Sequence, residues 1–244
     1  MSCQFYIYFL LLLTVNSNGY AQDTTEIKQA KHVNKGFLDF NGYYDTREFS
    51  VMTLNLLAVL PHRFQYFSLT NFQGPTRTSD LSNYYSEQNV RWNFMKNIPL
   101  DFTSQWVLKS GINNDVLKFG FRWSLHKSKG LRNFFKKLNL SYSINPFFIQ
   151  FAQNKQTQYL TQIEHVYKLK ILPTVLNDRI YIGGFIDQNF LSDNNKVMMK
   201  FVTEHQLGLR IIDQLYAVLE FRINEYLPND NYGFGYGLEY KIKF

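Results

Sequence analysis

The sequence has few of the residues that build disulfides, metal centres or membrane helices. Its one cysteine, Cys3, lies at the start of the chain, so neither a disulfide framework nor a thiolate metal site is expected. The five histidines are scattered without zinc-ligand spacing, and we expect no metal and no cofactor. After residue 21 no apolar run approaches the length of a membrane-spanning helix.

Apolar residues are nevertheless frequent, and aromatic residues reach 18%, mostly Phe and Tyr, a composition that favours strands. The first apolar run, Phe5–Leu13, is followed by the small residues of Gly19-Tyr20-Ala21. This pattern predicts a secretory signal peptide over 1–21, although no Lys or Arg precedes the run. Residues 22–34 are polar and are expected to form a short tail.

The last stretch, Tyr232–Phe244, alternates strictly between apolar residues at even positions and glycine or charged residues at odd positions. Side chains alternate across a strand, so one face is apolar and the other polar. The stretch is long enough for a transmembrane strand, which needs about 9–11 residues. Its alternating aromatics and terminal Phe244 resemble the C-terminal signal of bacterial outer-membrane barrels, which implies contact with the outer-membrane assembly machinery.

The same alternation recurs along the chain and predicts an all-β, transmembrane, antiparallel up-and-down barrel over 35–244. An even strand number places both termini on one side, expected to be the periplasm, with membrane lipid around the wall. The twelve expected strands cover 35–46, 49–60, 63–74, 84–95, 100–110, 116–126, 138–149, 158–171, 179–190, 200–212, 215–226 and 232–244.

Some segments are less regular. The third strand places Phe67 and Leu69 on the face opposite Ser68 and Thr70, and 150–157 and 191–196 are expected to be polar loops. The turn 127–137 breaks the alternation and has apolar residues at helical spacing, which predicts a short helix at the membrane surface or a protein-docking site. Much of the net charge of +7 lies in this turn, so we expect no nucleic-acid partner.

Strand parity also predicts the residues that face the barrel interior. Charges of both signs and aromatic rings alternate with lipid-facing residues, so the interior has no strong field of one sign. Twelve strands could enclose a narrow channel for a small polar solute, or an internal ladder of salt bridges that only stabilises the barrel. The candidate solute-binding residues are Tyr43, Arg91, Lys118, Arg122, Glu164, Tyr181, Phe185, Asp187, Glu204, Arg210, Tyr216, Glu220 and Arg222.

Two fragments, Asn41–Arg47 and Tyr181–Phe185, together with the twelve-strand layout, resemble the nucleoside-specific outer-membrane channel family (Tsx-like). The resemblance implies passive uptake of nucleosides, with bases on lumen aromatics and sugars on lumen charges. A structural or adhesive barrel and a barrel enzyme acting on lipid or peptide remain alternatives. Against an enzyme, His165 and His205 fall on the outward face without the Ser-Asn-Gly that follows the histidine in outer-membrane phospholipases.

Overall fold

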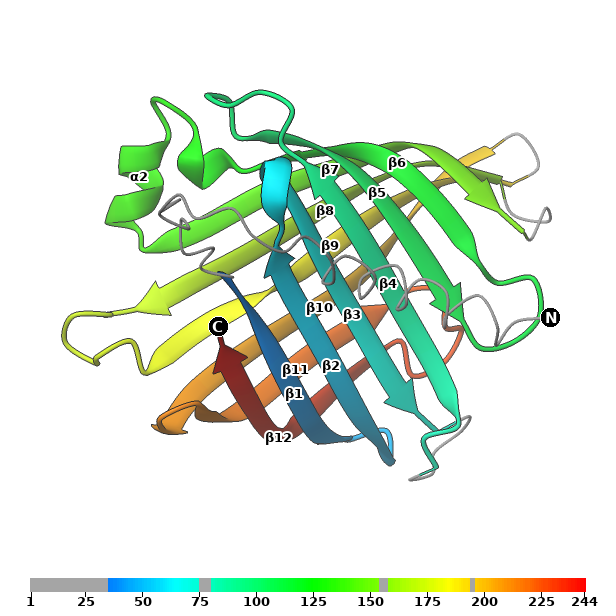
Figure 1. Cartoon of the computed structure of the whole chain (residues 1–244). Coiled ribbons are helices and arrows are strands. Elements are labelled where there is room, and N and C mark those ends of the chain that lie inside the picture. The colour runs from blue at the N-terminus through cyan, green and yellow to red at the C-terminus, as the bar shows by residue number, and fades with distance from the viewer. Residues whose placement is uncertain (1–34, 75–79, 154–157, 194–195) are drawn as a thin grey trace, which may run out of the picture. The chain divides into compact units, whose positions relative to one another are not determined.

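The computed structural model describes residues 35–74, 80–153, 158–193 and 196–244; the expected signal peptide and tail lie outside these residues. Twelve antiparallel strands close into one barrel, with β1 hydrogen-bonded to both β2 and β12 (Figure 1). The strands are β1 (Lys35–Asp45), β2 (Phe49–Val59), β3 (Phe64–Gln73), β4 (Asn83–Trp92), β5 (Leu100–Lys109), β6 (Val116–Trp123), β7 (Leu140–Ala152), β8 (Gln158–Ile171), β9 (Ile180–Asp193), β10 (Lys196–Ile212), β11 (Leu215–Asn224) and β12 (Tyr232–Lys243). The expected fold is therefore confirmed.

The connections alternate between two ends of the barrel. The terminal rim holds connectors 60–63, 93–99, 124–139, 172–179 and 213–214 together with the chain's C-terminus. The loop rim holds the described connector residues 46–48, 74, 80–82, 110–115, 153 and 225–231. The terminal rim carries three short helices, η1 (Pro61–Arg63), η2 (Leu125–Lys127) and α2 (Arg132–Lys137), and α2 agrees with the helical spacing in the sequence.

Closure of the barrel depends on the last strand. β12 pairs with β1 from Phe37↔Lys243 to Asp45↔Gly235, and the terminal residue extends this ladder. The backbone N–H of Gly36 donates to the carbonyl of Phe244 at 2.8 Å. Since every strand then has two neighbours, the ladder hydrogen bonds of the wall are satisfied within the barrel, as a hydrocarbon environment requires.

The outer wall is apolar along most of its circumference. Residues directly opposite each other in an antiparallel pair lie on the same face, so the register sets the inside and outside of each strand. Exposed rings such as Trp106, Tyr236 and Phe151 lie outside, and Phe102 stacks on Phe119 with ring centroids 6.2 Å apart. The parity expected for most strands is confirmed, including the lumen side of Lys118 and the outer side of Phe119.

β3 is an exception to the usual polarity. Its register with β2 pairs Leu69 with Asn55, which puts Leu69 in the lumen and Ser68 and Thr70 on the outer wall. The alternation read from the sequence is correct, but on this strand the polar face is outside. Thr70 lies 2.8 Å from Ser86 of β4, so the hydroxyls satisfy each other across the strand pair.

Several strand ends differ from expectation. β7 continues to Ala152, β9 to Asp193 and β10 begins at Lys196, so much of the expected loops 150–157 and 191–196 is strand. Leu191 is buried on the lumen side and extends the inner face of the β9–β10 hairpin. β6 ends at Trp123, three residues early, because η2 begins the connector at Leu125.

Candidate functional site

The lumen is the candidate site, and the strand register places every candidate residue named from the sequence on its inner face. The same register puts acidic and basic residues beside each other, as in Asp101↔Arg122, Glu204↔Arg222 and Asp39↔Lys241. The candidates do not form one cluster, however. They divide between an open cavity toward the loop rim and a filled half toward the terminal rim.

The open part, called here the vestibule, is a cavity of about 670 Å³ that ends at the loop rim. Its wall combines polar and apolar surface and contains both signs of charge. Of the candidate residues named from the sequence, the vestibule is lined by Lys118, Phe185, Asp187, Glu204 and Arg222. Further lining residues that the sequence analysis did not select include Arg47, Tyr85, Lys109, Gln150 and Tyr226.

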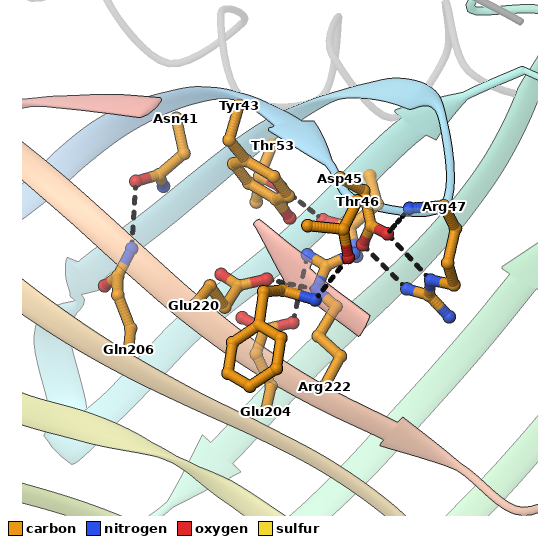
Figure 2. A network of polar contacts seen from close by, with 12 residues as sticks. Asn41, Tyr43, Asp45, Thr46, Arg47, Thr53, Glu204, Gln206, Glu220 and Arg222 are labelled. Carbon is orange, nitrogen blue, oxygen red and sulfur yellow. Dashed lines mark hydrogen bonds and ion pairs between the residues drawn. The ribbon is translucent and has the colours of Figure 1, made fainter. Parts of the chain in front are cut away.

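Arg47 is the most informative of the missed residues, because the sequence analysis placed it between the first two strands and not among the lumen residues. Its Nε and Nη2 donate to the two carboxylate oxygens of Asp45 at 2.7 and 2.8 Å, which is a bidentate pair (Figure 2). Nη1 also donates to the carbonyl of Asp230 across the mouth at 3.2 Å. Gly233 makes room for this pair, since a Cβ there would lie 2.4 Å from Arg47 Nε.

A second ion pair lies deeper in the vestibule. Arg222 Nη2 is 3.2 Å from a carboxylate oxygen of Glu204, and its Nε donates to Glu220 (Figure 2). The guanidinium of Arg222 also lies over the ring of Tyr43, with Cζ 4.7 Å from the ring centroid. Arg47 lies over the ring of Phe49 in the same way, at 5.1 Å. These two arginines are therefore neutralised by neighbouring carboxylates.

The lysines of the vestibule lack such acidic partners. Lys118 Nζ donates to the side-chain carbonyl of Gln162, and Lys109 Nζ lies 5.6 Å from the ring centroid of Tyr85. Neither forms an ion pair with any residue that the structure describes. Both amide atoms of Gln150 also have no hydrogen-bond partner among the described residues. The vestibule thus offers free donors and an acceptor to a polar solute.

Aromatic rings lie close to these polar groups. Tyr85 donates its hydroxyl to Glu87, and Lys200 Nζ is 5.0 Å from the ring centroid of Tyr226 in the connector 225–231. Burial raises the pKa of Tyr226, so its hydroxyl remains a hydrogen-bond donor. Together with Phe185, these rings give the vestibule flat apolar faces between its hydrogen-bonding groups.

The half of the lumen near the terminal rim is occupied by side chains. Tyr181 of β9 donates its hydroxyl to Glu239 of β12, a contact that skips two intervening strands. Lys241 bonds Glu239 and lies 3.3 Å from Asp39. Lys168 Nζ covers the Tyr181 ring at 3.6 Å, and Tyr216 packs edge-on to it at 5.8 Å. The aromatic pair expected to contact solute is therefore enclosed by charged neighbours.

A second network of side-chain contacts lies on the lumen face of β3–β6. Arg122 donates to Asp101 and, across two intervening strands, to Gln65 Oε1 at 2.6 Å. Arg91 reaches the same Gln65 oxygen at 3.4 Å and lies over the ring of Phe67. These contacts resemble the internal ladder that the sequence left open as the alternative to a channel.

Two of the remaining candidates, Glu164 and Arg210, also have protein partners, whereas the Oδ1 atom of Asp187 has no hydrogen-bond partner among the described residues. Asn145 donates to Glu164 inside the lumen, while Arg210 donates to the carbonyl of Asn177 at the terminal rim. The lumen glycines at 120, 183, 208, 233, 235 and 237 leave no open space, since a Cβ at each would contact a neighbouring atom. A Cβ at Gly208 would lie 2.2 Å from the Tyr181 ring, so the missing side chain admits that tyrosine instead.

The two outward histidines pair with tyrosines of the wall. The hydroxyl of Tyr142 lies 2.7 Å from His165 Nδ1, and that of Tyr167 lies 2.7 Å from His205 Nδ1. Within the described residues, no cluster of three His, Cys, Asp or Glu side chains suits a metal ion. No helix in the described part of the chain has the length and apolar character to cross a membrane.

Comparisons with known proteins support the fold. No known protein family and no curated protein matches the sequence. Among solved structures, the KdgM porin aligns with 84% of this chain and 98% of its own, at 11% identity and a TM-score of 0.51. The COG4313 outer membrane channel from Pseudomonas putida F1 aligns with 91% of this chain and 100% of its own, at 10% identity and a TM-score of 0.50. At such identities the likeness concerns the barrel architecture.

Proposed function

We propose that this chain spans the bacterial outer membrane and provides a passive route for small polar solutes. The observation that carries the proposal is the vestibule of about 670 Å³, lined by charged, polar and aromatic side chains, inside a closed barrel with an apolar outer wall. Two of the barrels to which the structure is similar are a porin and an outer membrane channel. We further propose that the terminal rim faces the periplasm and that residues 1–21 direct export.

The proposed solute is uncharged or weakly anionic and partly flat. Arg47 and Arg222 are paired with carboxylates, which leaves Lys109, Lys118 and the amide of Gln150 to hydrogen-bond hydroxyl or carbonyl groups. Flat rings gain from aromatic faces, and Tyr85 and Phe185 supply them. A nucleoside fits this description, so the nucleoside hypothesis is retained with its contacts moved from Tyr181 and Tyr216 to the vestibule.

A barrel without transport is the second candidate, because the half of the lumen near the terminal rim is crossed by side chains. Passage requires the Tyr181–Glu239 contact or the Arg122–Gln65 contact to open transiently. If both contacts persist, the vestibule is a blind binding site. We propose the channel because each contact is a single hydrogen bond between side chains of strands that two other strands separate. Rotamer changes can part such side chains without breaking the backbone ladder.

Planar-bilayer recording of the purified protein tests the proposal. We expect a small single-channel conductance that added nucleoside reduces at roughly millimolar concentration, since a channel site must release its solute. If sugars, peptides or fatty acids change the current and nucleosides do not, the channel proposal stands and the nucleoside assignment is rejected. Complete absence of current from correctly folded protein would favour the barrel without transport.

A further inference from the structure

A second cavity lies on the outer wall of the barrel, away from the lumen. It is an apolar groove of about 260 Å³ over β5, β6 and β7, and its exposed lining surface is apolar throughout. The residues that line it are Leu100, Phe121, Trp123, Ile144, Pro146 and Phe148. The groove therefore faces the medium that surrounds the barrel.

The groove arises from an irregular seam between β6 and β7. The register shifts between Phe119 and Gly120, so that Phe148 has no partner on β6. Pro146 lacks the N–H that a regular ladder would use at this position. A Cβ at Gly120 would lie 1.9 Å from the carbonyl oxygen of Pro146, so glycine permits the close approach beside the bulge. The sequence thus builds the groove into the wall.

The connector 124–139 joins β6 to β7 at the terminal rim. It lies at one end of this groove and is positively charged. It contains no acidic residue. Its basic side chains are exposed and form no ion pair with any residue that the structure describes. They are Lys127, Lys129, Arg132, Lys136 and Lys137.

Specific contacts fix the connector next to the groove. The indole N–H of Trp123 donates to the hydroxyl of Ser128 at 2.8 Å, so one groove residue is bonded to the connector directly. The backbone N–H of Tyr142, two residues before Ile144, donates to His126 Nδ1 at 3.2 Å. Phe135 of α2 is buried and stacks on the ring of Tyr142 with centroids 6.0 Å apart. Figure 1 shows α2 beside the end of β7.

We propose that this groove and connector form a binding site for an anionic glycerophospholipid of the leaflet at the terminal rim. An acyl chain lies in the apolar groove, and the phosphate contacts the basic side chains of the connector. An apolar groove alone would accept any lipid, whereas the cluster of unpaired cations selects a negative headgroup. The inference rests on the membrane location proposed above and not on solute passage.

Trp123 supplies a probe inside the proposed site. The chain has three tryptophans, so Trp92→Phe and Trp106→Phe leave Trp123 as the only indole. This variant is reconstituted in phosphatidylcholine vesicles that contain an equal mole fraction of either brominated phosphatidylglycerol or brominated phosphatidylcholine. We expect Trp123 quenching to show a roughly fivefold preference for the anionic lipid, from the attraction of several basic groups.

Two sets of substitutions separate the connector from general surface charge. Lys129→Gln, Arg132→Gln and Lys136→Gln in the connector should abolish the preference. Arg63→Gln, Lys96→Gln and Arg179→Gln remove equal charge from other connectors of the same rim, all at exposed positions, and should leave it unchanged. Heat-modifiable migration in a detergent gel confirms that each variant is folded before it is compared.

Equal quenching by the two lipids would overturn the proposal and leave an unselective lipid contact. Loss of the preference in both sets of variants would also overturn it, because the cations of the connector would then have no special role. Quenching by neither lipid would reject this site and the membrane location together. A preference for the anionic lipid in a protein without current would reject only solute passage, which keeps the two proposals separable.

Discussion

The two halves of the lumen are made from the same kinds of residues but organise them differently. Near the terminal rim, Lys241 is held between two carboxylates, those of Asp39 and Glu239, with a tyrosine closing the group. Near the loop rim, Lys118 has a neutral amide as its partner and an open cavity beside it. Mixed charge therefore does not by itself make a pore. Side chains that bond across intervening strands fill the lumen, whereas charges paired along the wall, as in Arg47–Asp45, leave a cavity beside them.

The largest expected effect on stability comes from removing the positive charge of Lys241, which neutralises two buried carboxylates. Lys241→Met should lower the free energy of unfolding by about 3–5 kcal/mol, because it leaves two buried carboxylates without their cation. Lys118→Met is the matched control and should cost about 1 kcal/mol, the value of a single hydrogen bond. Urea unfolding in lipid vesicles measures both, and similar losses would remove the distinction between the two halves.

The second largest effect is expected from a charge placed on the lipid-facing side of β6. Phe119→Arg places a charge on the lipid side and should destabilise the barrel by about 2–4 kcal/mol near the bilayer midplane. Lys118→Gln changes the neighbouring residue on the lumen side and should have a much smaller effect. Folding yield into vesicles, followed by gel migration without boiling, measures the two. The reverse order would show that the inner and outer faces of β6 are assigned wrongly.

Gly208→Ala should perturb the filled half by overpacking. Its Cβ would meet the Tyr181 ring, and the expected cost is about 1–3 kcal/mol. Gly42→Ala is the control, because a Cβ there has no atom within 4 Å among the described residues. Unfolding of both variants in urea gives the difference. A neutral Gly208→Ala would indicate that Tyr181 has room to move and that this half of the lumen is less tightly closed.

The smallest expected effect concerns solute. Tyr85→Ala should weaken nucleoside block by up to about tenfold, since an aromatic contact contributes about 0.5–1.5 kcal/mol. Tyr216→Ala removes a ring of similar size from the filled half and should leave the block unchanged. Concentration dependence of the block in planar bilayers measures both. If only Tyr216→Ala weakens the block, the solute binds in the half near the terminal rim.

A large part of the fold could be predicted from alternation alone. A period of two residues places Phe119 outside once Lys118 is inside, and the same rule held along the last strand and most others. Alternation did not decide which face of β3 lies inside, and there Ser68 and Thr70 face outward. The reason is that alternation separates two faces without naming them, and neighbouring hydroxyls on β4 let the polar face lie outside.

The site was less predictable, because its contacts join residues distant in the chain. Arg47 pairs with nearby Asp45, but its place at the mouth depends on Gly233 and Asp230 of the chain's last hairpin. The sequence by itself determined the strands, their faces and the mixed charge of the lumen, since these follow from local periodicity. Only closure and register decided which charges neutralise each other and where a cavity remains, because both depend on distances across the barrel.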